Sequence, residues 1–185
     1  MIEPWESVDA QPRGDYKVFR VREERRRSPQ TGEAHPFFVI EAGDWINIIP
    51  LTDEGQVVCI RQYRHGREEV TLEVPGGMVD AGETPEQAAR REMREETGYE
   101  AGEIVYLGAV APNPAIQDNL CHSFLALGAR AAGPPRPEGT EIIEVTHVDA
   151  AAVPGLIVEG QITHALTVTA FYYFEHWQRG LRRPA

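Results

Sequence analysis

Runs of apolar and β-branched residues, separated by turn residues, predict a domain rich in β-strands. Two buried strands are expected at 45–51 and 57–63, joined by a tight turn at 52–55. Pro75-Gly76-Gly77 is expected to stop a third strand, and the Gly- and Pro-rich segment 131–139 to form a loop. Four further strands are expected, at 69–74, 103–111, 119–127 and 141–148.

Helical spacing of apolar residues appears towards the end of the chain. Residues 162–177 predict a helix that ends by Gly180, whereas 149–159 is a weaker prediction because Pro154 and Gly155 interrupt it. His164 and His176 fall on this apolar stretch, where a structural role is expected. Strands and helices mix around one sheet system without an internal repeat, so the fold class is α/β or α+β.

The first 44 residues predict an N-terminal β-hairpin extension, and residues 45–185 the main domain. Residues 16–42 have the pattern of a hairpin, with turn chemistry at 28–32. An isolated hairpin is marginal in water, and its apolar residues need a surface to cover. A two-fold partner offers such a surface, so we expect a homodimer that uses this extension.

Composition narrows the class of partner. The net charge of −11 argues against a nucleic-acid groove, because phosphate backbones are held by excess Lys and Arg. The basic run at 20–27 is interrupted by two glutamates and is better interpreted as a solvated strand. The chain has no apolar run of about 18 residues and no N-terminal signal pattern, so no membrane span and a cytoplasmic protein are expected. Cys59 and Cys121 lie in apolar runs and are expected in the core.

The segment 84–98 predicts a helix whose ends are well specified. Thr84 is a candidate N-cap, Pro85 takes the first helical position, and Gln87 can close a capping box back to Thr84. Gly98 can adopt the left-handed conformation that ends such a helix. The glycine loop before this helix and the stop after it therefore fix which residues share a face.

Three glutamates lie on one side of that helix, because Glu92, Glu95 and Glu96 stand at i, i+3 and i+4. At an effective dielectric of about 20 and a separation of about 5 Å, the repulsion of one such pair is about 3 kcal/mol. A cation would offset this repulsion, and oxygen ligands select Mg²⁺ or Mn²⁺. Taken alone, the three glutamates are more typical of a solvated amphipathic helix.

The wider pattern changes this interpretation. The order is Gly, five residues, Glu, seven residues, Arg-Glu, two residues, Glu-Glu, one residue and Gly. This segment resembles the Nudix box, and its fixed positions are occupied by Gly77, Glu83, Arg91, Glu92, Glu95, Glu96 and Gly98. The resemblance implies a Nudix α/β/α sandwich with a mixed β-sheet, preceded here by the N-terminal hairpin.

The resemblance also implies a metal site. Residues that match Glu92 and Glu96 are the principal metal ligands of Nudix hydrolases, and Glu95 is a further ligand or holds a water. The backbone carbonyl of Gly76 often completes the metal shell. Two or three Mg²⁺ ions, or Mn²⁺ in their place, would bridge a diphosphate and activate the attacking water.

The other box residues are expected to support this site. The arginine that matches Arg91 pairs with a carboxylate of the box and orients it, and Glu83 supports the loop and the helix. An ordinary surface ion pair is the alternative for both residues. Their position in the box favours an orienting role.

Outside the box, the chain resembles the branch that hydrolyses ADP-ribose and other nucleoside diphosphate sugars. The segments Arg61-Gln62-Tyr63-Arg64 and 72–77 carry most of this resemblance, with looser support from the prolines in 111–115 and from the N-terminal hairpin. The resemblance implies a nucleotide-sugar substrate and a dimer. Cleavage of triphosphates, dinucleoside polyphosphates or capped RNA, or a non-catalytic sensor, are the alternatives.

The same resemblance suggests residues that meet the substrate. The general base of that branch precedes a strand, which indicates Glu141, with Glu138 as the alternative; a solvated loop glutamate fits Glu141 equally well. Arg61 and Arg64 suit phosphate oxygens, but strict alternation lets both reach one ligand only if the strand ends before Arg64. Trp45 and Phe38 could stack on the nucleobase of the substrate, although core packing fits each of them somewhat better.

Overall fold

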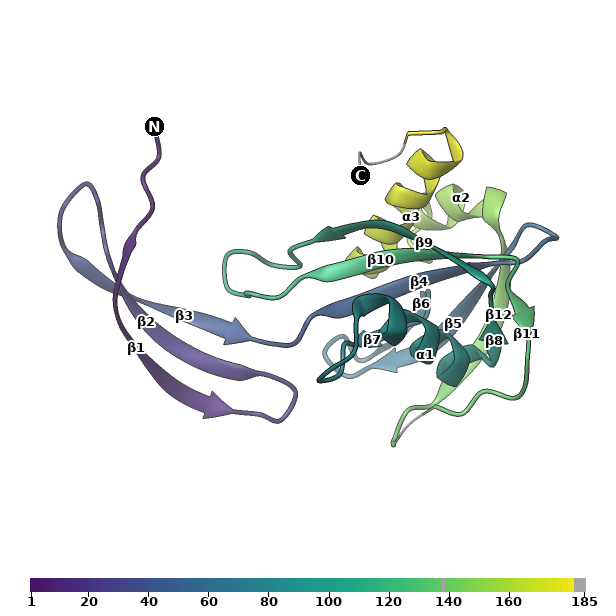
Figure 1. Cartoon of the computed structure of the whole chain (residues 1–185), viewed down its shortest axis with the longest axis horizontal. Helices are drawn as coiled ribbons and strands as arrows, with labels where there is room; N and C mark the ends of the chain where they lie inside the picture. Colours follow the sequence, from purple (N-terminus) through teal and green to yellow (C-terminus); the bar gives the residue numbers. More distant parts are fainter. Residues whose placement is uncertain (138, 182–185) are drawn as a thin grey trace. The chain divides into compact units, whose positions relative to one another are not determined.

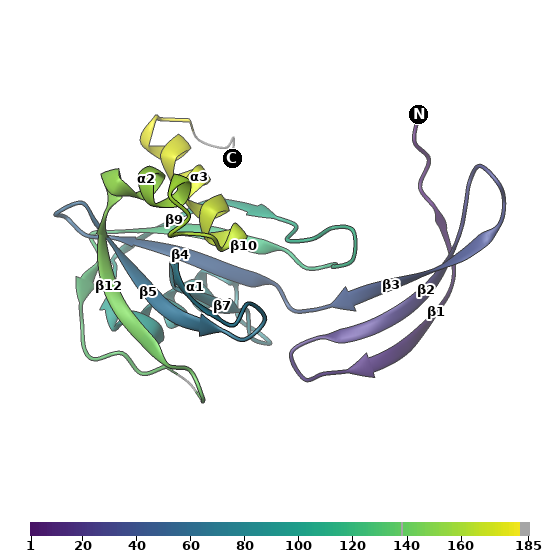
Figure 2. The same cartoon turned by 180° about the vertical axis from the view of Figure 1, so that it is seen from behind.

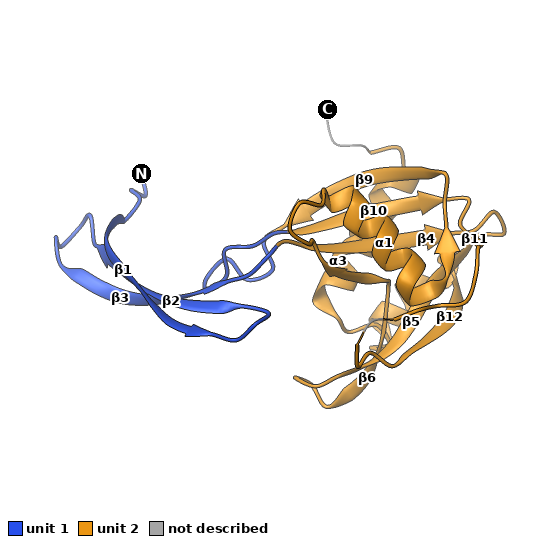
Figure 3. Cartoon of the chain, turned by 60° about the horizontal axis from the view of Figure 1, so that its bottom comes forward, with its two compact units in different colours: residues 1–43, 111–120 blue, residues 44–110, 121–185 orange. Residues whose placement is uncertain are grey.

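The computed structural model describes residues 1–137 and 139–181 of the chain. These residues form two compact units, which Figure 3 distinguishes by colour. Unit 1 comprises residues 1–43 and 111–120, and unit 2 comprises 44–110 and 121–185. The hairpin segment expected from the sequence thus lies in unit 1, together with a short segment that the sequence did not indicate.

Unit 1 is a three-stranded antiparallel sheet in the order β1-β2-β3. Its strands are β1 (Glu6–Asp15), β2 (Arg20–Arg27) and β3 (Ala34–Glu41). The hairpin predicted within 16–42 is confirmed as β2 and β3. Strand β1 was not predicted, because its polar sequence contains Pro12 and Gly14. Phe38 of β3 is 57% exposed, so the interpretation of Phe38 as a core residue is wrong.

Unit 2 is built on a seven-stranded mixed sheet. Its main path runs β12-β5-β4-β10-β9, while β6 pairs with β5 and β7 pairs with β4. Strands β4 and β10 are parallel, and the other pairs are antiparallel (Figure 1). The strand bounds are β4 (Trp45–Leu51), β5 (Gln56–Arg64), β6 (Glu69–Glu73), β7 (Gly76–Met78), β9 (Glu103–Val110), β10 (Cys121–Leu127) and β12 (Ile143–Asp149).

Helices cover both faces of this sheet, as Figures 1 and 2 show. Helix α1 (Pro85–Thr97) packs on one face, and α2 (Val153–Val158) and α3 (Ala165–Gln178) pack on the other. Alternate residues of β4 serve the two cores: Ile46 and Ile48 join the α1 core, and Ile49 joins the α3 core. The predicted α/β/α sandwich with a mixed sheet is confirmed.

Some elements differ from the prediction. The strand predicted at 69–74 ends at Glu73, ahead of Pro75-Gly76-Gly77 as expected, but Gly76 and Gly77 then open β7, which pairs with β4. Two short strands that were not predicted, β8 (Tyr99–Glu100) and β11 (Arg130–Ala131), pair with each other. A 3₁₀ turn (Ala150–Ala152) precedes α2. Helix α3 begins three residues later than expected, so His164 is its N-cap residue rather than part of the helix.

Both cysteines are buried free thiols, as expected for core residues. Burial raises the pKa of each thiol to about 12, so both stay protonated at neutral pH. Across residues 1–137 and 139–181, no helix is long and apolar enough to cross a membrane.

Candidate active site

Helix α1 begins and ends as its sequence predicted. The Thr84 hydroxyl accepts the N–H of Gln87, and the Gln87 side chain accepts the N–H of Thr84, which completes the capping box. Gly98 ends the helix with a φ of 73°, in the left-handed region that favours glycine. These ends set the rotation of the helix, which decides where its three glutamates point.

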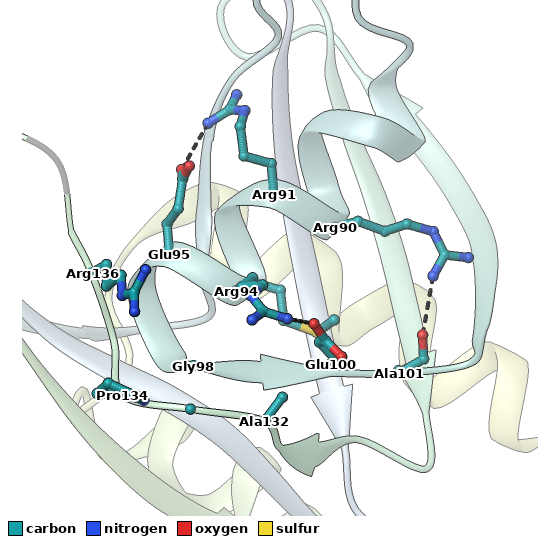
Figure 4. A pocket seen from close by; sticks show the side chains of 12 residues that line it. Arg90, Arg91, Arg94, Glu95, Gly98, Glu100, Ala101, Ala132, Pro134 and Arg136 are labelled. Carbon is teal, nitrogen blue, oxygen red and sulfur yellow. Dashed lines mark hydrogen bonds and ion pairs between the residues drawn. The ribbon is translucent and has the colours of Figure 1, made fainter.

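Arg91 lies at the centre of the carboxylates on this helix. Its Nε and Nη2 donate to the two carboxylate oxygens of Glu83 at 2.9 and 3.0 Å. Its Nη1 donates to Glu92 at 2.8 Å and to Glu95 at 3.1 Å, the latter drawn in Figure 4. Nη2 also donates to the carbonyl of Met78 at 3.0 Å. One planar guanidinium therefore fixes three carboxylates and the loop before the helix.

The carboxylate of Glu96 is held on the buried side of the helix. The side chain is 2% exposed, and its Oε2 accepts the N–H of Gly76 at 2.9 Å. Burial raises the pKa of Glu96 to about 8 despite this bond, and the charges of Glu92 and Glu141 add to the effect. Burial also raises the pKa of Glu92, and Glu95 and Glu141 act in the same direction.

Two glycines let the backbone lie against these carboxylates. A Cβ on Gly77 would lie 2.1 Å from Oε1 of Glu92, which no side chain could tolerate without moving that carboxylate. A Cβ on Gly76 would lie 2.5 Å from the carbonyl oxygen of Ile46 on the paired strand. Strand β7 therefore needs glycine at Gly76, where the backbone lies opposite, and at Gly77 a side chain would displace the carboxylate of Glu92.

The donor set suits a hard divalent cation. Its members are carboxylate oxygens, and burial with mutual repulsion makes the charges of Glu92 and Glu96 costly without a counter-ion. Within the part of the chain that is described, no three His, Cys, Asp or Glu side chains are gathered tightly enough to hold a metal ion as they stand. Arg91 draws Glu92 and Glu95 towards itself, and Gly76 binds Glu96. Rotation of these side chains would be needed to bring the oxygens onto one ion.

Arg64 lies beside this group and is held by a buried carboxylate. Its Nε and Nη2 donate to the two oxygens of Glu73 at 2.8 and 2.7 Å, and Glu73 is 2% exposed. Burial opposes ionisation, but the bonds from Arg64 and Thr71 outweigh it and keep the pKa of Glu73 below its ordinary value. The charges of Glu96 and Glu141 are close enough to raise the pKa of Arg64.

The two arginines of β5 are not equivalent. The strand continues through Arg64, so alternation places Arg61 and Arg64 on opposite faces. The condition under which both could reach one ligand is therefore not met. Arg61 is exposed and pairs across the sheet with Glu144 of β12 and Leu72 of β6.

Each of the remaining four predicted residues has a different location. Trp45 is partly buried and lines a cavity with Arg64 and Gly76. Glu141 precedes β12, and its charge acts on the box carboxylates as described above. Phe38 belongs to unit 1. Glu138, the alternative base, lies outside the described residues.

The sequence did not indicate Glu73 or Asn47 as site residues, and it assigned His164 a structural role only, although all three surround Arg64 and Trp45. Glu73 holds Arg64, Asn47 of β4 lies next to Gly76, and His164 reaches the same cavity from the start of α3. No motif contains all three. Only the alternation of side chains along β4 gives a signal for one of them. It places the polar Asn47 on the opposite face of the sheet from its neighbours Ile46 and Ile48.

A second cavity, of about 700 Å³, lies along the other side of α1 and is drawn in Figure 4. Three arginines of α1 line it, and each is engaged: Arg90 with Glu86 and the Ala101 carbonyl, Arg91 as above, and Arg94 with Glu100. The segment after β11 closes it, since the N–H of Arg136 donates to the Glu95 carbonyl at 2.6 Å. The cavity thus touches Glu95 and Arg91 from outside the carboxylate group.

Comparisons with known proteins identify the family of the chain and a related fold. A family model described as the NUDIX domain matches residues 44–167. The ADP-ribose pyrophosphatase of Bacillus subtilis is 30% identical over 78% of this chain and 78% of its own length. The GDP-mannose pyrophosphatase of Citrobacter koseri is 34% identical over 75% of this chain and 77% of its own. A crystal structure of an ADP compounds hydrolase superposes with a TM-score of 0.86, at 19% identity and 97% coverage of both chains, which bears on the fold alone.

Proposed function

The chain belongs to the Nudix hydrolase family, and we propose that it cleaves the pyrophosphate bond of a nucleoside diphosphate sugar such as ADP-ribose. The products would be a nucleoside monophosphate and a sugar phosphate. The observation that carries the proposal is the carboxylate group of Glu92, Glu95 and Glu96, organised by Arg91 beside the glycines of β7. The names of the two pyrophosphatase relatives support the substrate class.

Nudix hydrolases generally use divalent cations, and we propose Mg²⁺, with Mn²⁺ as a substitute, for this chain. Glu92, Glu95, Glu96 and the carbonyl of Gly76 would hold it. When bound, such an ion neutralises the diphosphate and brings the pKa of water towards neutrality. The raised pKa values of Glu92 and Glu96 support this, because a cation would stabilise both in their charged form.

The protein's own groups then have distinct parts in hydrolysis. The oxygen of a water molecule forms a bond to one phosphorus, the bridging P–O bond breaks, and the departing phosphate keeps its electron pair. Glu141 would accept the proton that the water loses. Arg91 keeps Glu92 and Glu95 oriented, and Arg64, fixed by Glu73, would face the substrate phosphates.

A substrate panel tests this proposal. The purified protein is incubated with Mg²⁺ and with ADP-ribose, GDP-mannose, ATP or a dinucleoside polyphosphate, and the products are separated by chromatography. We expect the nucleotide sugars to give the highest kcat/KM, and the reaction to stop with a chelator. Higher kcat/KM values for ATP would contradict the substrate assignment.

The role of Glu141 is tested by comparison with a neighbouring glutamate. Glu141→Gln is expected to lower kcat by about 100-fold or more, since general-base catalysis contributes about 10²–10⁴-fold. Glu144→Gln is the matched control, because Glu144 is also exposed and lies three residues further along. Equal activity of the two variants would leave Glu141 as a solvated loop residue.

We propose further that residues 1–44 form an extension through which two copies of the chain associate. The sheet of unit 1 is a single layer of three strands and leaves several aromatic residues 38–58% exposed. These are Trp5, Tyr16, Phe37 and Phe38. A self-complementary surface on a second copy would cover them.

A further inference from the structure

A cavity of about 290 Å³ lies on the α3 side of the sheet, next to the glycines of β7. Trp45 and Asn47 of β4 line it, together with His164 and Leu166 at the start of α3. Its volume is at the lower end of the range for small-molecule sites, about 300–1,000 Å³. It therefore suits one ring of a substrate rather than a whole nucleotide sugar.

Asn47 brings an unused hydrogen-bonding group to this cavity. The residue is 6% exposed, and its Nδ2 is buried without a hydrogen-bond partner among the described residues. A buried polar group without a partner costs about 1–3 kcal/mol. Gly76 leaves room for the amide, because a Cβ there would lie 2.7 Å from Oδ1 of Asn47. Rotation of the Asn47 side chain, which lines the cavity, would bring this amide to a ligand there and give it the partner that it lacks.

His164 supplies a hydrogen-bond acceptor to the same cavity, whereas the amide nitrogen of Asn47 is a donor. Nδ1 of His164 lies 3.2 Å from an oxygen of Glu73 and 3.2 Å from the hydroxyl of Thr167. The lone pair of an unprotonated Nδ1 would face the negative oxygen of Glu73, so Nδ1 carries the proton. Burial lowers the pKa of His164, and the ring is neutral at pH 7. Its Nε2 is then an acceptor, and no described side chain donates to it.

The charges around the cavity balance. The guanidinium of Arg64 is matched by the carboxylate of Glu73, to which it is joined by two hydrogen bonds. What remains for a ligand is a neutral amide, a neutral acceptor and the apolar surface of Trp45 and Leu166. A hydroxyl group both donates and accepts, so neighbouring hydroxyls can meet both needs. A phosphate would have no use for the neutral acceptor, and the substrate phosphates are left to Nη1 of Arg64, which makes no hydrogen bond to Glu73.

We propose that this cavity binds the sugar of the nucleotide sugar, with its hydroxyls hydrogen-bonded by the amide of Asn47 and by Nε2 of His164. The proposal rests on the function proposed above. The sugar would then be recognised on the α3 face of the sheet, next to β7. The glycines of β7 contact the carboxylates of Glu92 and Glu96. Trp45 packs against the sugar ring, and Glu73 holds both Arg64 and His164 in place.

The two products are used as inhibitors, so that binding of the sugar half and of the nucleotide half of the substrate can be measured separately. Competitive inhibition of ADP-ribose hydrolysis is measured with ribose 5-phosphate and, separately, with AMP. His164→Asn keeps a donor near the Nδ1 position but lacks Nε2, and His164→Gln places a polar group near Nε2. We expect His164→Asn to weaken ribose 5-phosphate binding about 5- to 10-fold, as one lost hydrogen bond predicts, and to leave AMP binding unchanged. His164→Gln recovers part of the loss.

Asn47→Leu is the second arm of the experiment. It removes the amide at similar volume, and because Nδ2 has no described partner, the fold is expected to keep or gain stability. We expect KM for ADP-ribose to rise about 5- to 10-fold with little change in kcat, as for loss of uniform binding. His176→Asn, a partly buried histidine on the last turn of α3 that does not line this cavity, is the control and should change neither constant.

The outcomes separate this inference from the proposed function. If the wild-type protein hydrolyses ADP-ribose and the two site variants weaken AMP binding instead, the cavity binds the base and the inference is wrong. Unchanged binding of both products in folded variants would also overturn it. Failure of the wild-type protein to hydrolyse any nucleotide sugar would instead contradict the proposed function.

Discussion

Replacing Glu96 by glutamine is expected to have opposite effects on the stability of the metal-free protein and on its activity with Mg²⁺. Burial raises the pKa of Glu96 from 4.5 to about 8, so the metal-free folded protein holds a proton at pH 7 that the unfolded chain has lost. The 2.5 pH units between 4.5 and 7 correspond to about 3 kcal/mol of lost stability. Glutamine removes this cost and can still accept the N–H of Gly76. We therefore expect Glu96→Gln to stabilise the metal-free protein by at most about 3 kcal/mol.

The sign follows from proton linkage. A carboxyl whose pKa is raised on folding makes the folded state bind more protons, so stability falls as pH rises from about 4.5 to about 8. The difference between wild type and Glu96→Gln should accordingly grow over this interval and be small below it. Urea unfolding with a chelator present, at several pH values, measures it directly.

Activity should change in the opposite direction. With Mg²⁺ present, Glu96→Gln is expected to lower kcat/KM by more than about 100-fold, beyond the 10–100-fold typical of residues that only orient a ligand. Glu86→Gln, on an exposed position of the same helix, is the control and should leave both stability and activity near wild type. A Glu96→Gln protein that is less stable without metal, or fully active with it, would refute the reasoning.

Three shorter predictions test other parts of the site. Gly77→Ala should abolish most activity, because its Cβ would lie 2.1 Å from Oε1 of Glu92; Gly102→Ala, with open space around it, is the control in the same activity assay. Arg91→Lys should lower kcat about 10–100-fold while the protein stays folded by circular dichroism, since an ammonium cannot make the forked bonds to three carboxylates. Full-length protein should be a dimer by light scattering at micromolar concentration, and deletion of residues 1–42 should give monomers; a full-length monomer would exclude the dimer.

The sequence was most informative where a local rule and a chemical need coincide. The ends of α1 follow from Thr84, Gln87 and Gly98, because capping residues act within one turn of the helix. Once those ends are fixed, the spacing of the glutamates fixes their common face. The mixed α/β class was likewise predictable from the alternation of strands and helices. The contacts of Arg91 with Glu92 and Glu95 could also be predicted, because all three residues lie within about one turn of the same helix.

Long-range pairing was harder to predict, and β7 illustrates the reason. Pro75-Gly76-Gly77 has the composition of a turn. A single sequence does not show that Gly76 and Gly77 pair with Asn47 and Ile46 of β4. The glycines leave room for what approaches them in space: the Glu92 carboxylate lies at Gly77 and the backbone of Ile46 at Gly76. Composition identifies glycine as permissive, but only the folded sheet distinguishes a turn from a close approach.

The pairing of Glu73 with His164 could not be predicted from the sequence for the same reason. Glu73 ends a strand and His164 precedes a helix about 90 positions later, so no spacing rule joins them. Their association depends on the start of α3 lying next to the end of β6, which brings Nδ1 of His164 to 3.2 Å from the carboxylate that already holds Arg64. A buried charge must find its partners wherever the fold supplies them. A charged residue predicted in a buried strand therefore indicates that a partner exists, and the structure is needed to identify it.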